Sequence, residues 1–470
     1  MAMSCGSPQR SWRGSALVAA DDGATLAVTL EESRYDRQER VSWWDQERLA
    51  SATVLVVGAG ALGNEVVKNL ALIGVGTICV LDIDTIESSN LARCVFFRPG
   101  DEGRAKAPTL AKRARGLNPD VTIEGVVADV RTFGTGLFLR ADVVVGALDN
   151  REARLYCNRL AARTRRSWVD GAIEALSGIA RVFNPPTSCY ECTLSEADWE
   201  VLAHRQSCRL LSRDQMEGGK VPTTATTSSI VAGIEAQEVV KLLHGRGSGV
   251  QPLTGAIVFD GANNDAYPLT YAPREDCLAH NPYDPISVVD LPGDALKALS
   301  AIELARLVWP DAGSDEPLVI ELADDHVIAW RCTNCGNTTP EHRPATLIDW
   351  GEAACATCGE GRVPEFVTSV DVPGPQAQRT LAEFGIRTDE ILSVRRGVEE
   401  RYAWLAALDD RLPITWHTAT TSPAQAVTRH ENLRLDADPE GIGTSDPAVA
   451  ATSTVRISVP AGSMDDDEDV

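Results

Sequence analysis

The sequence has few basic residues for its length. Its 44 lysines and arginines stand against 67 aspartates and glutamates, which gives a formal net charge of −23 and a pI near 4.8. Such a surface repels nucleic acid and anionic membranes, so we expect neither as a main partner. Part of the acidic excess is local, because the last residues form the run Asp465–Asp469 before Val470.

The sequence also lacks a long apolar run. No stretch reaches the ~18 residues that a membrane span needs. The first 33 residues hold no uninterrupted apolar stretch before a small-residue cleavage site, so we expect no signal peptide and a cytoplasmic protein. Hydrophobic residues still make up 44% of the 470 residues, which suffices for two or three packed domains.

The apolar pattern predicts an α/β fold. Continuous apolar runs at Ala52–Gly58, Thr77–Leu81 and Val143–Val145 are typical of buried parallel strands. Between and after them, Asn64–Ile73 and Ser228–Leu243 have the pattern of helices. This alternation of strands and helices indicates a Rossmann-like, doubly wound and mostly parallel sheet.

Composition divides the chain into four expected parts. The first part is weakly patterned, and in the last part Thr, Ser, Ala, Pro and Asp dominate, which predicts disorder. Within the third part we expect two helices, at Leu381–Phe384 and Glu390–Leu408. The expected parts are an N-terminal arm (1–33), an α/β domain (34–285), a smaller region (286–412) with two C-x-x-C pairs within about residues 328–365, and a disordered acidic tail (413–470).

A glycine-rich turn follows the first predicted strand. Gly58, Gly60 and Gly63 form G-x-G-x-x-G between a strand and a helix, where backbone N–H groups and the helix dipole favour a phosphate. Asp82 ends the second predicted strand, where a carboxylate can accept hydrogen bonds from a ribose. These four residues predict a nucleotide site, although they fit an NAD enzyme as well as an ATP enzyme.

Further polar motifs separate these two classes. The motifs are R-Y-D-R-Q at 34–38, N-L-A-R at 90–93, Lys106 in G-R-A-K-A, and Asp149-Asn150 in A-L-D-N-R-E-A-R. Together with the glycine turn, and in this order over about residues 34–285, they resemble the MoeB/ThiF/ubiquitin-activating enzyme superfamily. The resemblance implies an enzyme that uses ATP and Mg²⁺ to adenylate the C-terminal carboxylate of a ubiquitin-like or sulfur-carrier protein ending in glycine.

The resemblance also implies roles for single residues. These roles are chemically reasonable, because cations around a triphosphate reduce the repulsion that an incoming carboxylate meets. One position departs from the family: Cys94 stands where Gln often follows the arginine of N-L-x-R. The implied roles are ribose binding by Asp82, phosphate contacts by Asn90, Arg93 and Lys106, Mg²⁺ binding by Asp149 beside Asn150, and insertion of Arg37 into a partner subunit, hence a homodimer.

Cys208 is the candidate nucleophile. It lies between the first C-x-x-C pair and the Val221-Pro222-Thr223-Thr224 stretch, where ubiquitin-activating relatives carry the cysteine that takes the activated partner as a thioester. Arg205 and Arg209 flank it, and cations favour the thiolate. A ThiF-type route, in which sulfur converts the adenylate to a thiocarboxylate, remains the alternative. Thioester chemistry would imply a downstream cysteine-bearing conjugating enzyme.

Twelve cysteines in an intracellular chain point to metal sites rather than disulfides. Cys189-x-x-Cys192 and Cys277-x-x-His280 supply a Cys₃His set for tetrahedral zinc. The resemblance implies a structural zinc at this place, usually with four cysteines. For Cys79, Cys94 and Cys157, which lie in or beside predicted helices and strands, we expect packing roles.

A second set of four cysteines predicts a zinc ribbon. Cys332-x-x-Cys335 and Cys355-x-x-Cys358 are separated by 19 residues, and each pair is followed by glycine, which lets backbone N–H groups turn toward the thiolates. Zinc would supply folding free energy that so small a module lacks. With few cations nearby, we expect the ribbon to contact protein.

Two readings from other classes stay open. The chain could be a catalytically silent scaffold, against which the retention of the phosphate-binding cations argues. It could be an NAD-dependent oxidoreductase, for which those cations have no use.

Overall fold

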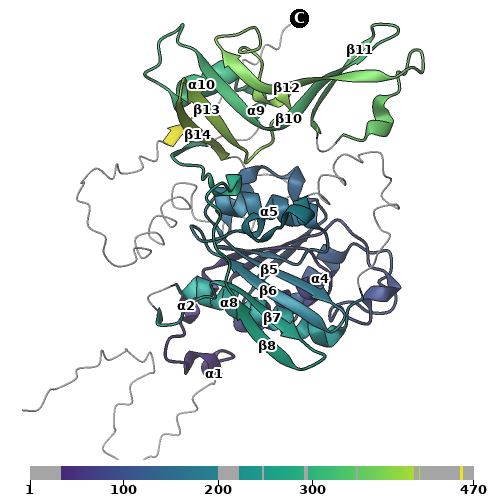
Figure 1. Cartoon of the computed structure of the whole chain (residues 1–470), viewed down its shortest axis with the longest axis vertical. Helices are drawn as coiled ribbons and strands as arrows, with labels where there is room; N and C mark the ends of the chain where they lie inside the picture. Colours follow the sequence, from purple (N-terminus) through teal and green to yellow (C-terminus); the bar gives the residue numbers. More distant parts are fainter. Residues whose placement is uncertain are drawn as a thin grey trace, which may run out of the picture.

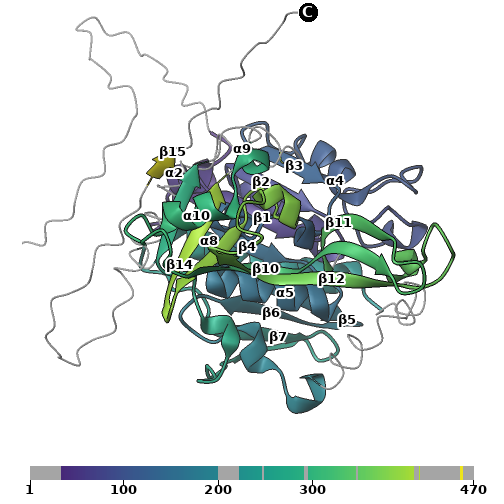
Figure 2. The same ribbon diagram turned by 90° about the horizontal axis from the view of Figure 1, so that it is seen from above.

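The computed structural model describes residues 33–199, 222–245, 248–290, 295–345, 348–406, 412 and 456–458. Within these ranges the chain forms two sheets, stacked one above the other in Figure 1 with α5 between them. Seen from above, the strands β10, β11 and β12 extend sideways across the first sheet (Figure 2).

The first sheet has eight strands in the order β3-β2-β1-β4-β5-β6-β7-β8. Strands β1 to β5 are parallel, and β6, β7 and β8 add antiparallel strands at one end. All residues of β1 and β2 are buried, as continuous apolar runs require. The bounds are β1 Thr53–Val57, β2 Thr77–Leu81, β3 Thr122–Val126, β4 Val143–Gly146, β5 Ser167–Glu174, β6 Ser177–Phe183, β7 Gly255–Asp260 and β8 Asp265–Leu269.

Helices cover both faces of this sheet. On one face α3 (Ala61–Ile73), α4 (Lys106–Ala114) and α8 (Ala225–His244) pack against the strands. On the other face lie α5 (Arg151–Arg163) and the short helices η2 (Val130–Thr132) and η3 (Thr135–Arg140). The predicted doubly wound α/β sheet and its two predicted helices are confirmed, with the antiparallel end added.

Two short helices precede the first strand. They are α1 (Asp36–Glu39) and α2 (Gln46–Ala50). The Gln38 side chain donates to the Ile73 carbonyl at 2.8 Å, so α1 lies against the C-terminal end of α3. This end is opposite to the glycine turn, which forms the start of α3.

The second sheet has seven strands, with β11-β10-β13-β14-β9-β15 in order and β12 paired with β10. It packs on α9 and α10 around Trp309, Phe384 and their apolar neighbours. The bounds are β9 Ile286–Asp290, α9 Ala295–Ala298, α10 Ala301–Val308, β10 Leu318–Cys332, β11 Thr338–Pro344, η8 Trp350–Ala353, β12 Arg362–Val372, η9 Leu381–Phe384, β13 Ile391–Arg396, β14 Glu399–Ala406 and β15 Arg456–Ser458.

Two sequence predictions in this region are corrected. The described part of the predicted helix Glu390–Leu408 is instead the hairpin β13–β14, because Gly397 takes a positive φ of 61° and turns the chain back. The short helix at Leu381–Phe384 exists as η9, capped by Thr380 and Glu383. In the tail that we expected to be disordered, β15 pairs in parallel with β9, so the prediction is wrong for these three residues.

A buried polar contact joins the two sheets. The Arg140 guanidinium, at the end of η3, pairs with Asp389 at 2.7 Å, and both side chains are at most 4% exposed. The Trp404 indole N–H donates to the same carboxylate at 2.8 Å. Glu390 accepts from the Thr135 hydroxyl at 2.6 Å. These contacts fix the second sheet on the loop that leads into β4.

Candidate functional site

The glycine turn lies where the order of the first sheet reverses. β1 has β2 on one side and β4 on the other, so their carboxyl ends open a crevice, the usual ligand site of such sheets. The Gly58 N–H donates to the Leu81 carbonyl at 2.8 Å, and the Ala147 N–H donates to the Val57 carbonyl at 2.8 Å. The glycine turn therefore lies between the loop after β2, which begins at Asp82, and the loop after β4, which contains Asp149.

Two of the three glycines are required by packing. A Cβ on Gly58, whose φ is +106°, would lie 2.3 Å from the Ala147 carbonyl oxygen, and a Cβ on Gly63 would lie 2.0 Å from the Gly58 oxygen. A Cβ on Gly60 would meet nothing within 4 Å. Gly60 is also the N-cap of α3 and lacks a side-chain cap, so its end of the helix is open to an incoming anion.

Asp82 is bonded to the glycine turn itself. One carboxylate oxygen accepts the Ala59 N–H at 2.6 Å, and the other accepts the Asp84 N–H at 2.7 Å. Burial raises the pKa of Asp82, although both N–H bonds and the charge of Lys106 favour the carboxylate. Each oxygen keeps a lone pair, so the group can still accept hydrogen bonds from a sugar.

Lys106 begins α4 and faces a group of acids. Its ammonium donates to Asp84 at 2.8 Å and is 13% exposed. Burial by itself would lower the pKa of Lys106, but the bond to Asp84 and the charges of Asp82, Asp84 and Asp149 outweigh burial and raise it. The structure thus brings Lys106 near the candidate ribose residue and the candidate Mg²⁺ residue.

Asn90 and Arg93 occupy the loop after β2. Asn90 is buried in the short helix η1 (Ser88–Asn90), where its side chain accepts the Glu87 N–H at 2.9 Å. Arg93 donates to the Thr223 hydroxyl at 3.1 Å. Asn90 therefore shapes this loop, whereas the Arg93 head group reaches the Pro222-Thr223 stretch.

Sequence reasoning missed Asn64, which ties the two loops together. It is fully buried in α3 and donates to the carbonyls of Ala59 and Gly60 at 2.8 and 2.9 Å. Its oxygen accepts the Phe96 N–H at 3.1 Å. An asparagine in the first turn of a helix that follows a glycine turn was the signal that could have identified it, because a buried amide needs hydrogen-bond partners.

Asp149 and Asn150 lie in the loop after β4, which we call the Asp149 loop (residues 147–150). Both are exposed. The Asn150 side chain caps α5 by accepting the Ala153 N–H at 2.8 Å. This bond fixes the end of the loop, and therefore the backbone position of the neighbouring Asp149.

Arg37 is not part of this group of residues. It lies exposed on α1, against the far end of α3. The 13 residues of α3 separate the two ends by about 20 Å. Arg37 therefore lies too far from the glycine turn to contact a nucleotide bound there.

Cys208 lies outside the described residues, in the gap 200–221. The residues on either side of that gap are both placed near the candidate site. Before the gap, Asp198 pairs with Arg151 at 2.7 Å, directly after the Asp149 loop. After it, Thr223 contacts Arg93.

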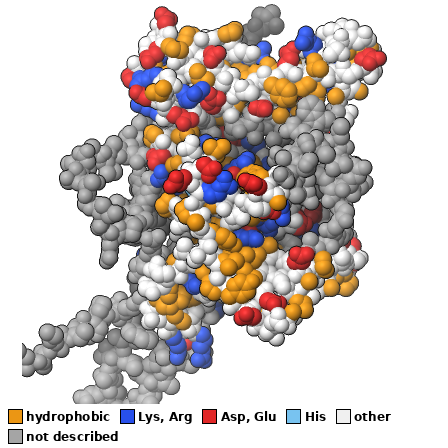
Figure 3. Space-filling model, in the orientation of Figure 1, with side chains coloured by type: hydrophobic (Ala, Val, Ile, Leu, Met, Phe, Trp, Pro, Cys, Tyr) orange, Lys and Arg blue, Asp and Glu red, His pale blue; other side chains and the backbone are white. Residues whose placement is uncertain are grey.

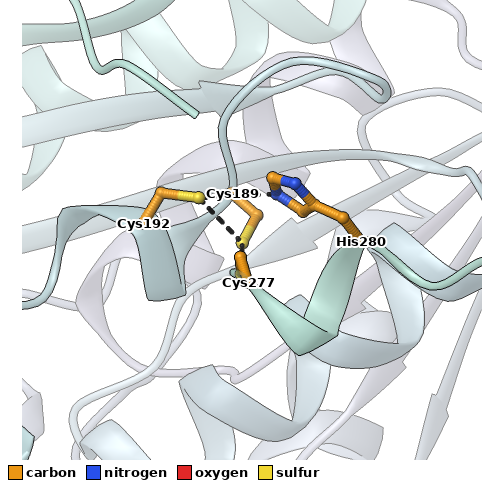
Figure 4. Close-up of side chains that lie close together, drawn as sticks. All are labelled: Cys189, Cys192, Cys277 and His280. Atoms are coloured by element: carbon orange, nitrogen blue, oxygen red, sulfur yellow. Dashed lines mark hydrogen bonds between the residues drawn. The ribbon is translucent and has the colours of Figure 1, made fainter. Parts of the chain in front are cut away.

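The structure brings the first predicted metal set together (Figure 4). The Cys189 sulfur lies 3.8 Å from that of Cys192 and 3.6 Å from that of Cys277, and the Cys192 sulfur is 3.5 Å from His280 Nε2. Tetrahedral zinc with Zn–S bonds of ~2.3 Å separates sulfurs by about 3.8 Å. The ligands come from η4 (Tyr190–Thr193) with its N-cap Cys189, and from η6 (Leu278–His280) with its N-cap Cys277.

The second set also converges, at the tip of β10, β11 and β12. The Cys332 sulfur lies 3.5 Å from that of Cys358, and the Cys335 sulfur lies 3.7 Å from that of Cys355. Backbone N–H groups of Thr357 and Cys358 lower the pKa of Cys355 to about 6.

The glycine that follows each of these pairs adopts a positive φ. The values are +71° at Gly336 and +76° at Gly359, and each N–H bonds back to the first cysteine of its pair, at 3.1 and 2.8 Å. Both turns thus take the form that the sequence predicted.

The three cysteines for which we expected packing roles are buried. Cys79, Cys94 and Cys157 are at most 3% exposed. Burial raises the pKa of the Cys94 thiol to about 11, so this residue offers no ready thiolate despite its place beside Arg93. None of the described helices is both long and apolar enough to cross a membrane.

Comparison with known proteins places this site in a family. The chain is 34% identical over 266 residues to the SAMP-activating enzyme E1 of Haloferax volcanii, an alignment covering 54% of this chain and 91% of that protein. It is 32% identical over 267 residues to the sulfur carrier protein adenylyltransferase of Thermus thermophilus, covering 53% and 91%. MccB of E. coli, solved with ATP, aligns at a TM-score of 0.45 and 21% identity, covering 54% of this chain and 75% of that chain.

The matched segment coincides with the first sheet and its loops. The ThiF family matches residues 35–279, which contain the glycine turn, Asp82, Lys106, the Asp149 loop and three of the four ligands of the first cysteine set. Because this match spans more than half of the chain, the protein belongs to the ThiF family.

Proposed function

We propose that this protein uses ATP to adenylate the C-terminal carboxylate of a ubiquitin-like or sulfur-carrier protein. The observation that carries the proposal is that Asp82 and Asp149 follow β2 and β4 on either side of the glycine turn, beside an uncapped helix start. Lys106 is tied to the loop after β2 by its ion pair with Asp84. The names of the two relatives, an activating enzyme and an adenylyltransferase, support it.

The chemistry needs cations and a closely fitting backbone. A carboxylate oxygen of the carrier forms a bond to the α-phosphorus of ATP, while the bond from that phosphorus to the bridging oxygen breaks and pyrophosphate leaves. Arg93 and Lys106 would counter the negative charge that opposes the attack and collects on the leaving group. The N–H groups at the start of α3 would hold phosphate oxygens close to the backbone of Gly60.

The Asp149 carboxylate is the group in this site that would bind Mg²⁺. Asp149 is exposed on a fixed loop and would hold the ion, whose oxygen-ligand preference a carboxylate meets. When bound, the ion would neutralise phosphate charge. Asp84 keeps Lys106 in place by their ion pair until nucleotide phosphates compete for the ammonium.

Cys208 is proposed as the acceptor of the adenylated carrier. The described residues on both sides of its segment contact the candidate site, through Arg151 and Arg93. Attack of its thiolate on the acyl carbon forms a thioester and releases AMP. The rival outcome is a thiocarboxylate, formed when a sulfur donor supplies the nucleophile, and the named relatives include both kinds of protein.

Zinc is proposed at both cysteine sets. Their sulfur separations fit a tetrahedral ion, and the sets hold Cys₃His and Cys₄ donors. With four protein ligands each, both ions would be structural. The first would hold the chain between β6 and α8 onto α5, and the second would hold the ribbon.

A protein partner is supported by the surface. All five residues of β8 are exposed, with Tyr267 at 45% and Leu269 at 38%, and Leu176 nearby is 46% exposed. Figure 3 shows apolar side chains gathered on the face where β7 and β8 lie. Exposed apolar groups of this kind mark protein contacts. We further propose a homodimer, in which Arg37 of one subunit serves the other subunit's site.

The adenylation step is tested by ATP–pyrophosphate exchange in the presence of glycine-tailed carrier proteins. Lys106→Ala should reduce exchange by about 100-fold or more. Lys112→Ala is the matched control, since Lys112 lies exposed near the other end of the same helix. Equal exchange by both variants would rule out the proposed role of Lys106, and absence of exchange by the wild type with every carrier would rule out the function.

The two outcomes for the adenylate separate at Cys208. Cys208→Ala should keep exchange but lose a thiol-sensitive conjugate between enzyme and carrier. A conjugate that persists excludes the thioester route. A carrier whose mass increases by that of sulfur replacing oxygen, in a reaction supplied with sulfide, would support the thiocarboxylate route. A silent scaffold and an NAD-dependent oxidoreductase would both fail to exchange pyrophosphate.

A further inference from the structure

The Asp149 loop is held from beneath by one buried arginine. Arg154, one turn into α5, donates to the Leu148 carbonyl at 2.7 Å and to the Gly171 carbonyl at 3.2 Å. Its side chain is 8% exposed. Leu148, the residue before Asp149, is therefore fixed by the Arg154 guanidinium.

Arg154 is itself fixed by a buried carboxylate. Asp170 on β5 accepts from Arg154 at 2.7 Å and from Arg181 at 2.8 Å, and it is fully buried. Its register partner is Gly146, the last residue of β4 before the loop. Burial opposes the charge on Arg154, but Asp170 outweighs it and raises the pKa of Arg154.

The cluster contains a fourth ionisable group. Glu235 on α8 is fully buried beside Gly171, and its oxygens have no hydrogen-bond partner among the described residues. Burial, followed by the charge of Asp170, raises the pKa of Glu235 well above its usual range. Asp170 is therefore the carboxylate that pairs with both arginines, whereas Glu235 makes no hydrogen bond to either of them among the described residues.

An aromatic ring from the Cys189–Cys192 segment faces both guanidinium groups. Tyr190, between Cys189 and Cys192, has the guanidinium carbons of Arg154 and Arg181 at 5.8 and 5.7 Å from its ring centre. Such cation–π contacts are strongest where water is excluded, and Tyr190 is 5% exposed.

The same ring belongs to a segment that is bonded to α5. The Tyr190 N–H donates to Asn158 at 2.7 Å, and Asn158 lies one turn after Arg154 on that helix. The Cys189–Cys192 segment therefore contacts both the helix that carries Arg154 and the guanidinium itself. Movement of this segment would shift the support of the Asp149 loop.

We propose that Arg154 and Tyr190 are positioning residues that couple the Cys189–Cys192 segment to the Asp149 loop, so that tight binding of Mg²⁺ with ATP needs the Tyr190 ring. The inference rests on the proposed function, because it assumes that Asp149 binds Mg²⁺. It assigns the Cys189–Cys192 segment a role in nucleotide binding, through Tyr190.

The test measures the Mg²⁺ concentration that half-saturates binding of a nonhydrolysable ATP analogue to the full chain, by calorimetry. Arg154→Lys keeps the charge but cannot hold Asp170 and two carbonyls at once, so it should raise this concentration about tenfold. Arg159→Lys is the matched control. Arg159 lies on the same helix and pairs with Glu191 of the same segment at 2.7 Å, yet it makes no hydrogen bond to the Asp149 loop within the described part of the chain.

A second pair of variants covers the case in which Arg154→Lys fails to fold. Tyr190→Leu removes the ring and should raise the Mg²⁺ requirement, whereas Tyr190→Phe keeps the ring and should restore most of the wild-type value. An unchanged requirement in Tyr190→Leu, or an equal rise in Arg159→Lys and Arg154→Lys, overturns the inference. If the wild type binds no nucleotide with Mg²⁺, the proposed function fails instead.

Discussion

The two regions each bring together one of the two sets of side chains at which we propose zinc, but the surroundings of the two sets differ. Beside the first set, Tyr190 packs on Trp168 and Phe183 within a large buried cluster under the first sheet. Beside the second set, the buried cluster consists of Val327, Trp330, Ala345 and Ile348, with Ala353 packed against it. Two of the second set's cysteines are exposed.

This difference implies that the two zinc ions that we propose would have different roles. A domain with an extensive core is folded by apolar burial, and a metal there adjusts local geometry. A small module with few buried residues needs the ion for its folding free energy. Changes to backbone packing should thus harm the first region, and loss of metal should harm the second.

The largest effect is expected from removing ribbon ligands. Structural zinc contributes on the order of 10 kcal/mol to the folding of small zinc modules. Cys355→Ser combined with Cys358→Ser should release one zinc and remove amide protection from about residues 328–365, while ATP–pyrophosphate exchange continues. Protection that survives in the zinc-free variant would show that the ribbon core is sufficient by itself.

The next largest effect concerns the glycine turn. Gly63→Ala forces a Cβ to 2.0 Å from the Gly58 carbonyl oxygen, so we expect a loss of about 5 kcal/mol in unfolding free energy. Gly60→Ala has open space and should fold normally while binding ATP more weakly, since the side chain stands where phosphate approaches. Urea unfolding and nucleotide titration of both variants separate the two effects.

A smaller change should separate the two regions from each other. Asp389→Ala leaves Arg140 buried without its carboxylate partner and removes the acceptor of Trp404, which should cost about 3–4 kcal/mol. We expect calorimetry to show two thermal transitions where the wild type shows one. A single transition at the wild-type temperature would mean that this contact does not join the regions.

A pH effect should report on the buried acid of the α/β domain. Because the folded pKa of Glu235 lies above its unfolded pKa, the folded state binds the proton more tightly. Its contribution to stability is full below the unfolded pKa and declines as pH rises toward the folded pKa. Glu235→Gln should flatten this decline in unfolding experiments between pH 5 and 8. Equal slopes for variant and wild type would contradict a protonated Glu235.

The smallest effect is expected from a ribbon glycine. Gly359 has a φ of +76° but open space around its Cβ position. Gly359→Ala should therefore cost only the backbone strain, about 1–2 kcal/mol, and keep its zinc. The losses of unfolding free energy in Gly359→Ala and Gly63→Ala should be measured together. Their difference shows how much of the need for glycine comes from close packing rather than from the backbone angle alone. A loss as large as that of Gly63→Ala would end the distinction between the two regions.

The spacing of apolar residues predicted some helices and strands correctly and others wrongly. Continuous apolar runs predicted β1, β2 and β4 correctly. A strand that is buried on both faces is apolar at every position, so it can be recognised without knowing which elements pack against it. The segment Glu390–Leu408 gave a false helix, since apolar residues on either side of a hairpin turn can imitate helical spacing. The turn at Gly397 decided between the two.

By itself the sequence determined the glycine turn, the ordered polar motifs and the two cysteine sets, because each depends on residue type at short spacing. Only the tertiary structure decided that Asn64 joins two loops, that Arg37 lies at the far end of α3, and that Arg154 links the Asp149 loop to Tyr190. These relations join residues from separate elements, and no local spacing encodes which buried groups come into contact when the sheet closes.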